Sequence, residues 1–104
     1  MRYDTPVLLL SEIQNNNDDL DHETTYLSKK VMANVKRTNL SLANGKMFDA
    51  TIVRTYGQYQ ADAIGFIGEY VQDDPSTIHL VQKVGRHFNR TDFYIIHSEV
   101  IYHG

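Results

Sequence analysis

Hydrophobic and polar positions alternate over several short segments of the chain, the pattern of strands with one buried face. Residues 77–102 show it most extensively, and their β-branched and aromatic content favours two paired strands of a long hairpin at the centre of the fold. The polar stretch 89–92, together with Gly85, predicts a connection longer than a tight turn. We expect the alternating apolar side chains of the two arms to lie in the core: Ile78, Leu80, Tyr94 and Ile96.

The first half of the chain predicts two strands separated by a loop. Residues 5–13 are an apolar run with Pro6 near the start, as in a first or edge strand. Residues 14–22 are rich in Asn and Asp and predict an exposed loop without the glycine and glutamate spacing of an EF-hand calcium site. Residues 24–38 alternate again and predict a long half-exposed strand, with a bulge at 27–29 where the parity of the apolar positions shifts.

The second half predicts two strands before the long hairpin. The Asn44-Gly45 pair indicates a turn, and residues 47–56 return to strand character. Residues 64–71 predict another strand, in which Gly65 and Gly68 mark a bulge or a close approach of the backbone.

About six strands at short spacing, without a convincing amphipathic helix, predict an all-β fold. We expect a small antiparallel β-barrel or sandwich with long loops and at most a short helix. At 104 residues, the chain is predicted to form a single β-barrel domain over residues 1–104.

Composition excludes several kinds of chemistry. The chain contains no cysteine, so it has no disulfide, no thiolate metal site and no cysteine nucleophile. Its formal charge of −3 argues against a protein whose main role is to coat duplex DNA, although local basic patches remain compatible with it. The longest apolar run, residues 7–10, is far shorter than the roughly 20 residues of a membrane span. With no leader-like segment before it, we expect a soluble, unexported protein.

The residues that could carry catalysis are scattered. None of the five histidines has the spacing of a known metal site, although His79 and His97 could face each other across the hairpin, with Glu99 nearby. No serine lies in a Gly-x-Ser-x-Gly turn, and no glycine-rich loop precedes a helix. We therefore expect no enzymatic activity, no metal and no cofactor.

One cluster in the hairpin mixes cations with aromatic rings. Surfaces that bind single-stranded nucleic acid combine these residue types, because bases stack on rings while phosphates follow positive charge. An ordinary half-exposed hairpin shows the same alternation, so the cluster supports nucleic-acid binding only as an alternative function. Its members are Lys83, Arg86, His87, Phe88, Arg90, Phe93 and Tyr94.

Several segments between residues 24 and 102 together resemble the head-closure, or head-tail joining, proteins of long-tailed bacteriophages. Residues 30–36 (Lys-Val-Met-Ala-Asn-Val-Lys) resemble the family's V-x-A-x-V strand, and residues 51–56 (Thr-Ile-Val-Arg-Thr-Tyr) resemble its I-x-I-R-Y strand. Either 67–71 or 93–96 resembles the G-x-x-Y-x-I strand. The resemblance implies a small β-barrel that forms a ring under the portal complex, closes the DNA-filled head and presents a surface to the tail.

The resemblance also implies the partners and the location. The expected partners are other copies in a homo-oligomeric ring, the portal or adaptor protein, tail proteins, and DNA that passes through the lumen without sequence readout. Membrane contact is not expected, and the protein would reside in the virion after assembly in the host cytoplasm. We expect contacts with the DNA or with partners at five cations: Lys36, Arg37, Lys83, Arg86 and Arg90. Subunit interfaces would use the acidic 14–23 loop or the 86–92 turn.

Overall fold

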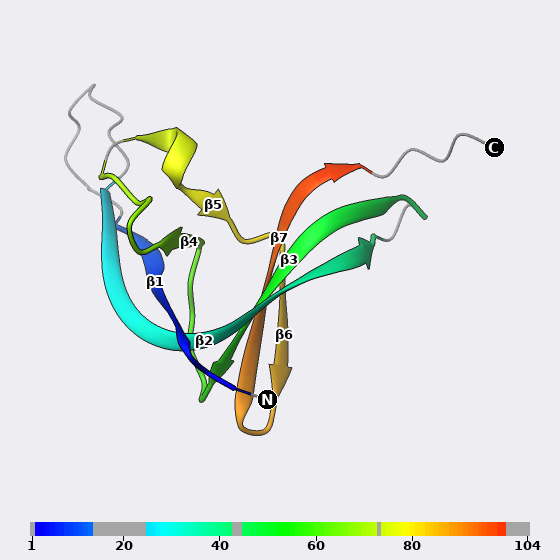
Figure 1. Ribbon diagram of the computed structural model, residues 1–104, viewed down its shortest axis with the longest axis horizontal. Coiled ribbons are helices and arrows are strands. Elements are labelled where there is room, and N and C mark those ends of the chain that lie inside the picture. Colours follow the sequence, from blue (N-terminus) through cyan, green and yellow to red (C-terminus); the bar gives the residue numbers. More distant parts are fainter. Residues whose placement is uncertain (1, 14–24, 43–44, 73, 100–104) are drawn as a thin grey trace.

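A computed structural model describes residues 2–13, 25–42, 45–72 and 74–99 (Figure 1). These residues form one seven-stranded antiparallel sheet in the order β5-β4-β1-β2-β3-β7-β6, so the predicted all-β fold is confirmed. The only helical element in the described ranges is the short 3-10 turn η1 (Pro75–Thr77). The strands are β1 (Thr5–Ile13), β2 (Thr25–Ser41), β3 (Met47–Tyr56), β4 (Ala63–Phe66), β5 (His79–Leu80), β6 (Lys83–His87) and β7 (Arg90–Glu99).

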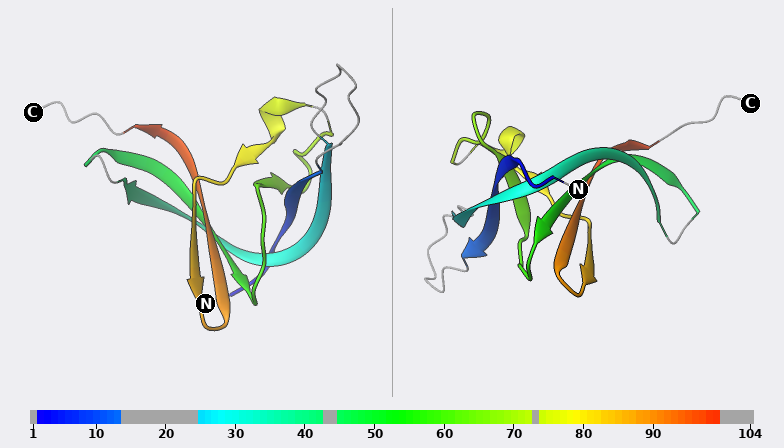
Figure 2. Two further views of the ribbon diagram at one scale, coloured as in Figure 1. Left: turned by 180° about the vertical axis from the view of Figure 1, so that it is seen from behind. Right: turned by 60° about the horizontal axis from the view of Figure 1, so that its bottom comes forward.

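The sheet curls into a half-barrel because the long central strands bend (Figures 1 and 2). β5 and β6 are the two outermost strands of the sheet, yet only Val81 and Gln82 separate them in the chain. The Val81 amide donates to the Asp62 carbonyl at 3.0 Å, and the Gln82 amide donates to the Tyr94 carbonyl at 2.8 Å. This short segment therefore joins the two ends of the sheet.

The core lies on the concave side of the curl, which we call the inner face. Phe93 is fully buried at its centre, next to Val53 on the neighbouring strand and Ile95 on the same strand. Alternate residues of each strand point to this side of the sheet. The other members of the cluster are Val7, Leu9, Val31, Ala33 and Ile64.

The predicted hairpin over residues 77–102 is wrong in extent and position. β6 and β7 form a shorter hairpin with a two-residue loop, Phe88 and Asn89, and β6 lies at one end of the sheet. Residues 79–80 pair with β4 instead of β7. The polar residues 90–92, predicted as part of a long turn, belong to β7, where the Thr91 carbonyl accepts from Thr55 and Asp92 forms an ion pair with Arg90.

The expected core side chains of this hairpin are also wrong. Leu80 is 57% exposed, and Ile78, Tyr94 and Ile96 are only partly buried. Residues 93–96 are all apolar, so no alternation of apolar and polar residues shows which of them are buried. The pairing of β7 with β3 decides which of these side chains are buried, and this pairing turns Phe93 and Ile95 inward.

Three other strand expectations are confirmed only in part. β1 is the first strand but not an edge, because β4 pairs with its free side. β2 pairs with β1 continuously through residues 27–29, so the predicted bulge is absent, and the register shift of the sheet lies instead between Asp49 and Ala50 of β3. The strand expected over 64–71 ends at Phe66. The expected loop at 14–22 lies outside the described residues.

Two glycine expectations are confirmed. Gly45 has φ +79° and its amide donates to the Leu42 carbonyl, which closes the turn between β2 and β3. Gly65 allows a close approach: a Cβ at this position would lie 3.0 Å from the ring of Tyr70. A side chain at position 65 would therefore displace the turn that follows β4.

Candidate functional site

The convex side of strands β2, β3, β7 and β6 carries three rows of cross-strand neighbours, which we call the basic face. Cross-strand pairs point to the same side of a sheet, and these residues alternate with the buried residues of the inner face. The first row is Lys36, Ile52, Tyr94 and Lys83; the second is Asn34, Arg54, Asp92 and Gly85; the third is Tyr56, Arg90 and His87.

The charge of the basic face is opposite to that of the chain. Its four lysines and arginines face a single carboxylate, whereas the chain as a whole has a formal charge of −3. The one carboxylate, Asp92, is only 1% exposed. The face therefore presents almost purely positive charge to solvent.

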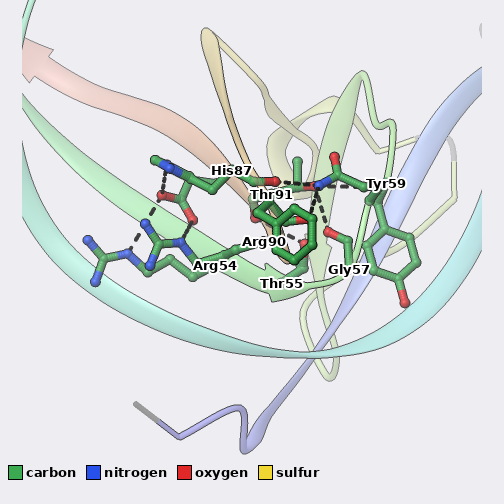
Figure 3. Close-up of polar contacts among 10 residues, drawn as sticks. Arg54, Thr55, Gly57, Tyr59, His87, Arg90 and Thr91 are labelled. Carbon is green, nitrogen blue, oxygen red and sulfur yellow. Dashed lines mark hydrogen bonds and ion pairs between the residues drawn. The ribbon is translucent and has the colours of Figure 1, made fainter.

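Asp92 belongs to the middle row of this face. Its carboxylate is contacted by the side chains of Arg54, His87 and Arg90, which Figure 3 labels. Arg90 Nε lies 3.0 Å from Asp92 Oδ1, His87 Nε2 lies 3.2 Å from Oδ2, and Arg54 Nε lies 3.9 Å from Oδ2. The two arginine contacts are ion pairs without good hydrogen-bond geometry in the described structure. They offset the high cost of burying a carboxylate.

The same contacts orient the two arginines. Each guanidinium group faces Asp92 through its Nε edge, and the side chains of Arg54 and Arg90 remain 29% and 30% exposed. Within the described ranges, their terminal amino groups are thus left to other acceptors. A guanidinium held in this way suits a planar oxyanion, which it can bind through two parallel hydrogen bonds.

A second set of contacts holds the hairpin on the other side of the sheet (Figure 3). The Thr55 hydroxyl donates to the Thr91 carbonyl at 3.0 Å, and the Thr91 hydroxyl donates to the Gly57 carbonyl at 2.8 Å. Gly57 has φ +115°, which favours glycine, and its amide donates to the Asn89 carbonyl at 2.9 Å. The hairpin tip is consequently fixed to the loop that follows β3.

The structure brings together three of the five cations predicted to make contacts. Lys36, Lys83 and Arg90 lie on the basic face. Arg37 lies on the opposite side of β2 and pairs with Asp49 at 3.1 Å. Arg86 likewise lies on the opposite side of β6, and its Nη1 donates to the Tyr59 carbonyl at 3.1 Å.

Sequence reasoning missed Arg54, which pairs with Asp92 across β3 and β7. A basic residue in the middle of an apolar strand was a usable signal, because such a position needs a partner when half-buried. The identity of that partner depends on the strand register, which the sequence did not reveal.

The rings of the predicted cation–aromatic cluster have different positions. Phe93 is fully buried in the core and cannot contact a ligand. Tyr94 lies on the basic face with Lys83 Nζ 5.9 Å from its ring centroid, a cation–π contact. Phe88 is 92% exposed in the hairpin loop.

The histidines do not form the site considered from the sequence. His79 lies on β5, which pairs with β4 and not with β7, and its ring packs edge-on against Phe66 at 5.2 Å between centroids. His97 Nε2 lies 2.6 Å from the Thr51 hydroxyl oxygen. The described residues contain no group of three or more His, Cys, Asp or Glu side chains arranged to hold a metal ion.

We expect His97 to titrate below its ordinary value near 6.5. Desolvation lowers the pKa of His97, the positive charges of Arg37 and His79 lower it further, and Asp49 partly opposes them. The protonated form of His97 is thus disfavoured in the folded state. The contribution of neutral His97 to folding stability is therefore fully present above pH 6.5, and it is lost as the pH falls through the pKa of the folded state. An NMR titration of its imidazole, with the urea-denatured protein as reference, measures the difference; equal pKa values in both states would contradict it.

Comparison with known proteins provides no relative for this chain. No family model, no curated protein and no solved structure matches it. No helix in the described ranges is long and apolar enough to cross a membrane. The basic face and the motif resemblance of residues 24–102 are therefore the observations from which a function can be argued.

Proposed function

We propose that this protein is a non-catalytic structural protein that contacts the phosphate backbone of nucleic acid through the basic face. One observation carries the proposal: four cations gather on one side of a net-acidic chain, and the only carboxylate among them is buried. Backbone contacts by lysine and arginine supply affinity without sequence readout.

The residues of the face have distinct roles in this contact. Arg54 and Arg90, oriented by Asp92, bind phosphate oxygens in a bidentate manner. Lys36 and Lys83 lie at opposite ends of the first row and act as mobile point charges. The exposed surface of a sheet meets the backbone and does not enter a groove, so binding is independent of base sequence.

The family resemblance suggests the setting for this contact. There, the protein is one subunit of a ring between the portal complex and the tail of a bacteriophage, and DNA passes through the lumen. The alternative is a free-standing nucleic-acid-binding β-barrel, which the same basic face supports. Deleting the gene from the phage genome distinguishes them: the connector role predicts heads separated from finished tails, and normally joined virions would leave only the alternative.

We expect the double variant Lys36→Gln/Lys83→Gln to bind DNA more weakly and with less dependence on salt. Each lost phosphate contact lowers the slope of log K against log salt concentration by about 0.9 for duplex and about 0.7 for single strands. Fluorescence anisotropy over a series of salt concentrations measures both quantities.

The matched control is the double variant Lys29→Gln/Arg37→Gln. It removes the same charge from the opposite side of β2, where Val31 and Val35 point toward the inner face. We expect its salt slope to remain that of the wild-type protein. Equal losses in the two variants would show that net charge alone governs binding and would refute a role for the basic face.

A further inference from the structure

Phe88 is the most exposed large apolar residue of the described chain, at 92%. It occupies the first position of the two-residue loop closed by the His87–Arg90 pair, at the hairpin tip seen at the bottom of Figure 1. Such loops favour Asn, Asp and Gly, and a phenylalanine there buries nothing. A residue that breaks the local rule without stabilising the fold points to a function.

The backbone around Phe88 is held in place although its ring is free. The Gln58 side-chain amide donates to the carbonyls of His87 and Phe88, and the Gly57 amide donates to that of Asn89. The ring is therefore presented from a fixed support, which reduces the entropy lost when it binds a partner.

The surroundings of the ring indicate the kind of partner. His87 and Arg90 pair across the base of the loop that holds Phe88 and form the end of the third row of the basic face. A nucleobase with its phosphate matches this combination, because the base offers a flat π-surface and the phosphate can accept hydrogen bonds from His87 and Arg90. A pocket in a protein partner would instead favour a broader apolar patch, whereas the residues flanking Phe88 are Arg86, His87, Asn89 and Arg90.

We propose that Phe88 stacks on an unpaired nucleobase, so that the protein prefers single-stranded over duplex nucleic acid. The inference rests on the proposed function, since the basic face must hold the backbone next to the hairpin tip. In duplex, each base is already stacked between its neighbours and offers no free surface to the ring. Phe88 thus adds a preference for single strands, which contacts with phosphates alone do not provide.

The test compares a labelled oligothymidylate with a duplex of equal length in anisotropy titrations at one salt concentration. Phe88→Ala should bind the single strand roughly 5- to 150-fold more weakly, the range expected for one stacked base, and should bind the duplex as the wild-type protein does. Phe88→Trp should retain single-strand affinity. It also introduces a unique fluorophore, because the chain contains no tryptophan, and saturating oligothymidylate should quench its emission.

Two results would overturn the stacking proposal while leaving the proposed function intact. In the first, Phe88→Ala binds the single strand as tightly as the wild-type protein does. In the second, the tryptophan emission of Phe88→Trp does not change when the strand is bound. Either result would favour a contact between the ring and another protein. Absence of binding to both nucleic acids by the wild-type protein would instead refute the proposed function, and the stacking proposal with it. Thermal unfolding of both variants near the wild-type temperature is expected, since the ring contributes no burial.

Discussion

Replacing Phe93 with alanine should lower the free energy of unfolding by about 3–5 kcal/mol. The ring is fully buried at the centre of the inner face, between β3 and β6, and its removal leaves a cavity that the sheet can only partly close. Total stabilities of small domains are about 5–15 kcal/mol, so the variant should be close to unfolding at ordinary temperatures. Urea denaturation followed by circular dichroism measures the change.

The Phe88→Ala variant is the matched control for this prediction. The substitution is the same and the two positions are five residues apart in one hairpin, but Phe88 is 92% exposed. Its free energy of unfolding should change by less than about 0.5 kcal/mol, as for surface substitutions in general. Similar losses in both variants would show that the inward direction of Phe93 is wrong.

Replacing Asp92 with alanine should cost about 2–4 kcal/mol of stability. Removing one partner of a buried ion pair typically costs about 3–5 kcal/mol, and the lower figure here allows for the partial exposure of Arg54 and Arg90, which water can reach. The guanidinium groups of Arg54 and Arg90 would then repel each other without their common carboxylate. Denaturant unfolding at neutral pH is the measurement.

Asp49→Ala provides the comparison for Asp92→Ala, because Asp49 also pairs with an arginine. Its partner is Arg37 at 3.1 Å, but both side chains are well exposed, at 43% and 62%. Surface pairs of this kind contribute about 0–1 kcal/mol, so the loss should be small. If Asp92→Ala were no more destabilising than Asp49→Ala, the carboxylate at the centre of the basic face would not hold the cations together.

Alternation and turn residues in the sequence correctly predicted an all-β protein and several of its strands. The expected strands at 5–13 and 47–56 correspond to β1 and β3, and the strand expected at 24–38 corresponds to the greater part of β2. Residues 24–38 and 47–56 show alternation, residues 5–13 contain a short apolar run, and Gly45 marks a turn by a local backbone requirement. Such features depend on neighbouring residues in the chain, so they can be read without the fold.

The basic face could be predicted only in part. Lys36 and Lys83 stand out in the sequence as cations on predicted strands and Arg90 as a cation of the predicted turn, yet Arg37 and Arg86 looked equivalent to them. A shift of one residue in a strand exchanges the two faces of a sheet, and the apolar run 93–96 allowed either assignment. The choice of face therefore depended on information that no local pattern contains.

Local pattern in the sequence determined that this chain forms antiparallel strands, where several of them begin and end, and which residue types can bind phosphate. Only the tertiary structure decided which cations share a surface. The pairing of β7 with β3 and β6 places Asp92 between Arg54 and His87 and turns Phe93 inward. The physical reason is that register is set by contacts between segments far apart in the chain, whose free energy exceeds the preferences of any single strand.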